Sequence, residues 1–122
     1  MTKVLALTCL ALTTWCAEAS ARCSVPRIHT FNNQSVDGRM TVNSGARCSI
    51  KLKHSGGPTY GAHIVQRAAS GTVTVDGSNR IVYRSRTGYV GSDSFTYART
   101  GESRVGDAVT RTVRIHVNVT AR

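Results

Sequence analysis

The clearest regularity in this chain is an alternation of apolar and polar side chains near its C-terminal end. Over residues 112–120 every second side chain is apolar, and the side chains between them are polar. Successive side chains of a β-strand point to opposite faces, so this period of two predicts a strand with one buried face. Six other stretches show the same period or a short apolar run: residues 40–42, 48–52, 64–65, 73–75, 81–83 and 95–97.

Turn-forming residues separate these stretches. Asp37-Gly38, Ser44-Gly45 and Asp76-Gly77 all fall between apolar runs, and further glycines follow the later ones. Beyond residue 21 no stretch has the spacing of an amphipathic helix. About seven short strands in roughly 100 residues are typical of an antiparallel β-sandwich, so an all-β fold of this kind is predicted.

The first 21 residues have a different character. Lys3 precedes a mostly apolar stretch over residues 4–17, and Ala19-Ser20-Ala21 then forms a small-x-small cleavage signal. This order predicts a secretory signal peptide over residues 1–21 and a single mature domain over residues 22–122. The apolar run is too short for a membrane span, so we expect a protein that is secreted, periplasmic or on the cell surface.

Cysteine usage agrees with export. Cys9 and Cys16 lie in the predicted signal peptide, which leaves Cys23 and Cys48 in the mature chain. Two cysteines in an oxidising compartment predict a disulfide. A zinc site would need two more ligands at short spacing, and none is adjacent.

One segment carries a resemblance to a known family. Residues 88–97 read G-Y-V-G-S-D-S-F-T-Y, which resembles the G-Y-x-G-x-D-x-F-x-Y signature of bacterial Ig-like and cadherin-like surface domains. The likeness extends over residues 66–120. It implies an Ig-like sandwich in which Asp93, Phe95 and Tyr97 form a structural tyrosine corner, with the Tyr97 phenol bonded to main chain a few residues upstream. The clustered acids of cadherin calcium sites are missing, so calcium binding is not expected.

Charge is the unusual feature of the composition. Lys and Arg total 16 against 6 Asp and Glu, a formal net charge of +10. Strand parity turns Lys51, Lys53, Arg80 and Arg84 outward, and the Ig-like strand order makes their two strands neighbours. These four residues are therefore predicted to form an anion-binding face. The competing explanation is that the charge serves solubility or reflects genome composition.

Catalytic chemistry is not indicated. The acids of the mature chain are scattered, no nucleophile elbow or phosphate loop occurs, and the four histidines lack metal-ligand spacing. We therefore expect no enzyme, no cofactor and no metal. The expected function is a binding module of the bacterial envelope whose partner is a protein or an anionic glycan or other envelope polymer, without specific nucleic-acid recognition. The alternatives are a structural subunit that pairs through an edge strand and a small periplasmic metal-handling protein; no signal for an oligomeric state is present.

Overall fold

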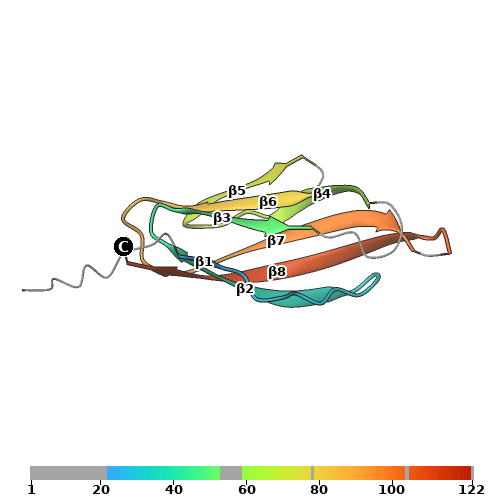
Figure 1. The fold of residues 1–122 in the computed structure, drawn as a ribbon, viewed down its shortest axis with the longest axis horizontal. Helices are drawn as coiled ribbons and strands as arrows, with labels where there is room; N and C mark the ends of the chain where they lie inside the picture. Colours follow the sequence, from blue (N-terminus) through green and yellow to red (C-terminus); the bar gives the residue numbers. More distant parts are fainter. Residues whose placement is uncertain (1–21, 53–58, 78, 104, 122) are drawn as a thin grey trace, which may run out of the picture.

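The computed structural model describes residues 22–52, 59–77, 79–103 and 105–121 (Figure 1). The predicted signal peptide and Lys53 lie outside the described residues. Within them the chain forms eight strands and no helix: β1 (Cys23–Ser24), β2 (Ser35–Asn43), β3 (Arg47–Lys51), β4 (Thr59–Gln66), β5 (Gly71–Asp76), β6 (Arg80–Ser85), β7 (Gly91–Glu102) and β8 (Ala108–Thr120). The all-β prediction is confirmed, and each of the seven predicted stretches overlaps one of the strands β2 to β8. The described part of the chain accordingly contains no helix that could span a membrane.

The strands form two sheets that lie one above the other (Figure 1). The larger sheet has the order β1-β2-β8-β7-β4, and the smaller has the order β3-β6-β5. Strands β7 and β8 form the longest ladder, from Gly91 opposite Val119 to Glu102 opposite Ala108. The strands of the smaller sheet are antiparallel throughout.

One pairing differs from the predicted antiparallel arrangement. Strand β2 runs parallel to β8, with Ser35 opposite Thr112 and Asn43 opposite Thr120. The reason lies in how the chain enters and leaves β2. The segment before β2 turns at Asn33, whose N–H donates to the Thr110 carbonyl at 2.8 Å, and the chain after β2 crosses at once to the other sheet through Gly45, at φ 75°. Strand β2 is therefore carried beside β8 in the same direction, and the five-stranded sheet is mixed.

The core lies between the two sheets and comes from the alternating positions of both. The fully buried side chains include Met40, Ile81, Tyr83, Phe95 and Ile115. The rings of Tyr83 and Phe95 stack across the interface with their centroids 5.6 Å apart. Phe95 and Tyr97 are both buried on the same face of β7, as their spacing predicts.

A disulfide fastens the start of the described chain to the smaller sheet. Cys23 on β1 is bonded to Cys48 on β3, and their Cα atoms are 5.2 Å apart. This is the pair that remains once the predicted signal peptide is removed. Because disulfides persist in oxidising compartments, the bond indicates an extracytoplasmic environment.

Candidate functional site

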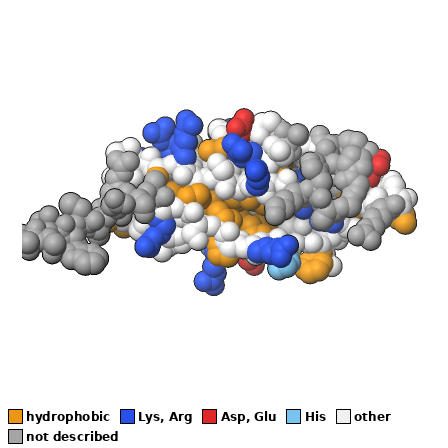
Figure 2. Space-filling model, viewed as in Figure 1, with side chains coloured by type: hydrophobic (Ala, Val, Ile, Leu, Met, Phe, Trp, Pro, Cys, Tyr) orange, Lys and Arg blue, Asp and Glu red, His pale blue; other side chains and the backbone are white. Residues whose placement is uncertain are grey.

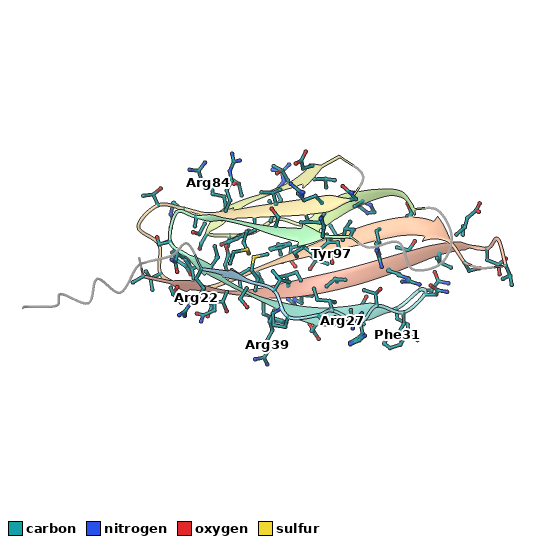
Figure 3. All side chains as sticks on the ribbon, viewed as in Figure 1. Arg22, Arg27, Phe31, Arg39, Arg84 and Tyr97 are labelled. Carbon is teal, nitrogen blue, oxygen red and sulfur yellow. A yellow bond between two sulfur atoms is a disulfide. The ribbon has the colours of Figure 1, made fainter. Side chains whose placement is uncertain are left out.

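The predicted cationic face lies on the outer side of the three-stranded sheet. Lys51 of β3 stands directly opposite Arg80 of β6, and all the charged side chains of these two strands are exposed. Arg84 of β6 stands opposite Arg47 of β3, and Figure 3 shows Arg84 pointing away from the molecule. Lys53, the fourth predicted member, lies outside the described residues. Arg47 was not predicted, although it has the outward parity of Lys51 four residues later.

Two like-charged pairs therefore face each other across β3 and β6. Like charges in directly opposite positions of a sheet repel and destabilise the pairing. The neighbouring strand β5 places Asp76 opposite Arg80 and Thr72 opposite Arg84. No salt bridge joins Asp76 to Arg80 in the described structure. The outer face of this sheet, which we call the cationic face (Arg47, Lys51, Arg80, Arg84), thus carries a clear excess of positive charge.

The outer side of the larger sheet is different because acids and bases are mixed there. Asp37 lies opposite Arg114 in the register of β2 and β8. Its Oδ1 is 3.0 Å from Nε2 of His116. Arg39, which Figure 3 places on the same side, is exposed. Arg39 and Arg114 are therefore suitable controls for the cationic face, because both are exposed and lie on the opposite layer.

The predicted tyrosine corner has a different hydrogen-bonding pattern from the one expected. The Asp93 carboxylate is buried and accepts the Tyr83 hydroxyl at 2.8 Å. It also accepts the main-chain N–H groups of Ala69 at 3.0 Å, Ser70 at 3.1 Å and Ser94 at 2.8 Å. Asp93 on β7 thus ties the larger sheet to β6 and to the approach to β5. Burial and the hydrogen bond to Asp93 raise the pKa of Tyr83.

Tyr97, by contrast, makes no hydroxyl hydrogen bond to any other described residue. Its ring is buried, which raises its pKa to about 12. The phenol that does bond to nearby main chain belongs to Tyr89, whose hydroxyl donates to the Ser92 carbonyl. Asp93 and Phe95 are both buried, and the corner-like bonds are made by Tyr83 and Tyr89.

A cleft opens between the two layers beside strand β3. It has a volume of about 720 Å³, and residues 25–31 form one wall while residues 49–52 form the other. Tyr97 lies at its floor, between the layers (Figure 3). Figure 2 shows hydrophobic side chains gathered in this region between the layers, with Lys and Arg side chains above and below them. The cleft is lined by apolar side chains, among them Ile28, Ile50 and Leu52, and by the basic side chains of Arg27, Lys51, Arg99 and Arg111.

Two arginines close one end of the cleft. Arg99 of β7 and Arg111 of β8 are opposite each other in the register and share the inward parity of Tyr97 and Val113. Both donate to Oγ1 of Thr30 at 3.1 Å, and Arg111 also grips Oδ1 of Asn32 through Nε at 3.0 Å and Nη2 at 2.7 Å. Burial, and next the nearby charge of Arg111, lower the pKa of Arg99. Through these hydrogen bonds the two arginines hold the wall formed by residues 25–31 in place, and they bring positive charge to the cleft.

Strand parity was the signal that would have located these arginines in the sequence. Each lies two residues from an apolar inward position, so alternation alone turns Arg99 and Arg111 toward the other sheet.

Neither the protein-family models nor the curated proteins with which we compared the chain match it. Among the described residues, no three His, Cys, Asp or Glu side chains are grouped closely enough to hold a metal ion.

Proposed function

We propose that this protein is an exported, non-enzymatic binding module with an Ig-like sandwich, and that it binds anionic polymers of the bacterial envelope through its cationic face. The observation that carries the proposal is the double juxtaposition of Lys51 with Arg80 and of Arg47 with Arg84. Mutual repulsion at these positions is relieved when an anion lies between the opposed side chains.

The strand order supports the Ig-like part of the proposal. In Ig-like sandwiches the second, fifth and fourth strands along the chain lie side by side in one sheet, in that order. If β2 is counted as the first strand, these are β3, β6 and β5, which is the order of the smaller sheet. The resembling segment over residues 88–97 includes the first part of β7, where Asp93 links the two sheets. The Cys23–Cys48 bond supports export, because it requires an oxidising compartment to persist.

The dimensions of the face suit a linear polymer. Opposed residues on neighbouring strands have Cβ atoms about 5 Å apart, and four residues along a strand span about 13 Å. Four cations spread over such an area contact several phosphate, sulfate or carboxylate groups of one chain at once. The side chains between them, Ser49 and Val82, offer no aromatic surface for stacking on bases, so no sequence preference is expected.

The test compares two charge-reversal variants with the same change in net charge. Arg47→Glu/Arg84→Glu alters the cationic face, and Arg39→Glu/Arg114→Glu alters the opposite layer. Binding of fluorescent heparin and of lipopolysaccharide is measured by anisotropy at about 50 mM and about 200 mM salt, since each neutralised anion releases counterions and steepens the salt dependence.

We expect the face variant to lose about tenfold or more in affinity and to show a shallower salt dependence, whereas the control loses at most about threefold. Equal losses in the two variants would mean that only total charge matters, and the proposed face would be abandoned. All four altered side chains are exposed, and the face variant replaces one like-charged pair by another, so its thermal melt should change little. The control places a carboxylate opposite Asp37, so a small loss of stability is expected there, and melts check that both variants are folded in the binding assay.

A further inference from the structure

Strand β3 has an open edge along the cleft. It is the first strand in the order β3-β6-β5, so only one of its sides is paired. The Leu52 N–H donates to the Asn79 carbonyl at 2.7 Å, on the β6 side. In an antiparallel pair the main-chain groups alternate in direction, so those of Cys48 and Ile50 also point to β6. The N–H and C=O groups of Ser49 and Lys51 therefore point away from β6.

The outward main-chain groups lie on the wall of the cleft. Ser49, Ile50, Lys51 and Leu52 all line it, and the segment 25–31 forms the other wall. Within the described residues no main-chain hydrogen bond joins Ser49 or Lys51 to that segment. The buried side chains of Ile50 and Leu52 extend toward the apolar interior of the cleft, over Tyr97. The edge thus offers hydrogen bonds to an added strand and an apolar surface beneath it.

The charges around the edge select the occupant. Arg27 and Lys51 stand at the two walls, and Arg99 and Arg111 lie at one end of the cleft. A second copy of β3 would bring Lys51 and Arg47 against the same cations, which like-charge repulsion opposes. An acidic strand is attracted instead, because its carboxylates would lie beside these basic side chains.

We propose that β3 accepts an extended acidic segment of a protein partner as an added strand, with apolar side chains at every second position filling the cleft. The proposal goes beyond polymer binding by the cationic face, because it uses the main chain of β3 and the interior of the cleft, and Lys51 is the one residue of the cationic face that takes part. A polypeptide fits where a glycan does not. Its donors and acceptors repeat with the period of the edge, and its side chains alternate between an apolar inside and a charged outside.

The probe is a capped peptide of eight residues in which Glu and Val alternate. The matched peptide replaces every Glu by Lys, and a third peptide carries N-methyl groups on alternate amides, which removes donors from one edge. Titration is followed by anisotropy of a fluorescein label and by amide hydrogen exchange detected by NMR.

We expect the Glu–Val peptide to bind at least about tenfold more tightly than the Lys–Val and N-methylated peptides. On binding, the amides of Ser49 and Lys51 become protected from exchange. The internal control is the other edge of the same sheet. The Arg86 N–H donates to the Ser70 carbonyl, so by the same alternation Val73 and Val75 present the outward amides of β5, and these remain unprotected.

Two variants at one position separate the main chain from the side chain. Ser49→Pro removes an outward N–H that β6 does not use, which edge strands tolerate, and Ser49→Ala keeps that N–H. We expect the first to lose about tenfold or more in affinity and the second to bind like the unaltered protein. In addition, the variant Arg27→Glu/Lys51→Glu should bind the Lys–Val peptide more tightly than the Glu–Val peptide, which reverses the order of affinity expected for the unaltered protein.

Equal binding of the three peptides to the unaltered protein would overturn the proposal without recourse to any variant. So would binding that protects no amide of β3, which would place the peptide on the cationic face or elsewhere.

Discussion

The hydroxyl of Tyr83 offers the sharpest test of how the two sheets are held together. We consider Tyr83→Phe, which removes a single oxygen from a fully buried side chain and leaves its stacking on Phe95 unchanged. The matched control is Tyr97→Phe, the same chemical change at another buried tyrosine. The two phenols differ in one respect: Tyr83 donates to the Asp93 carboxylate at 2.8 Å, and Tyr97 bonds to no other described residue.

The magnitude follows from the partner's charge. A hydrogen bond to a charged group contributes about 1.5–3 kcal/mol. Asp93 keeps its three main-chain donors in the variant, so the carboxylate is not stranded, and we expect a loss of about 2 kcal/mol. For a domain of roughly 100 residues this lowers Tm by about 8–16 °C. Tyr97→Phe should stay within about 0.5 kcal/mol of the unaltered protein.

Urea unfolding followed by circular dichroism, with a common m-value for all proteins, measures the two differences. If Tyr97→Phe costs as much as Tyr83→Phe, the hydrogen bond is not the source of the loss. The assignment of Asp93 as the link between the sheets would then be withdrawn.

Three further outcomes are expected. Reduction of Cys23–Cys48, whose partners are 25 residues apart, should lower the free energy of unfolding by about 3.5 kcal/mol in the chain-entropy treatment, and an unchanged urea midpoint with reductant would contradict this. The raised pKa values of Tyr83 and Tyr97 mean that the folded state favours their protonated forms, so this contribution to the free energy of unfolding is complete below about pH 10 and is lost as the pH rises above it. Tyr83→Phe should make the fall in stability with pH less steep. Parallel plots of stability against pH for the variant and the unaltered protein would refute the link between Tyr83 ionisation and folding. Gly71→Ala would place a Cβ 2.5 Å from the Arg84 carbonyl oxygen and 2.9 Å from the Tyr83 hydroxyl, so we expect a loss of about 1–3 kcal/mol in the same urea assay, and a neutral result would show that this contact relaxes.

Strand alternation proved a reliable guide to which face each side chain occupies. It placed Lys51, Arg80 and Arg84 outward and Phe95 and Tyr97 inward. In the structure the three basic side chains are exposed and the two aromatic side chains are buried. The same rule, applied beyond Tyr97, would have turned Arg99 into the cleft. Alternation is local, because it depends only on the geometry of a single strand.

The alternation does not predict which strand a given strand pairs with, or whether the two run parallel or antiparallel. Strand β2 has the same pattern whether it pairs parallel or antiparallel, and the choice is made by the turn at Asn33 and the crossing at Gly45. Similarly, Asp93 has two candidate tyrosine partners: Tyr97, four residues later on the same strand, and Tyr83, on the other sheet. Only the packing of β6 over β7 decides that Tyr83, and not Tyr97, meets the carboxylate. The contacts between the two sheets therefore could not be predicted from the sequence.

The disulfide also decides how the domain responds to tension. Both ends of the described chain lie at the same end of the sandwich: the Arg22 carbonyl accepts from the Asn43 N–H at 3.1 Å, and the Thr120 carbonyl accepts from the Ser44 N–H at 2.8 Å. A pull on these two ends enters at Cys23 and passes through the sulfur atoms into β3, so the covalent path bypasses the residues between Cys23 and Cys48, and β2 cannot be drawn out while the bond is intact. An extended residue spans about 3.3–3.6 Å, and the 5.2 Å between the two Cα atoms replaces a sequence separation of 25 residues in the stretched path. The oxidised domain therefore lengthens by about 77–85 Å less than the reduced one when it is stretched to full extension.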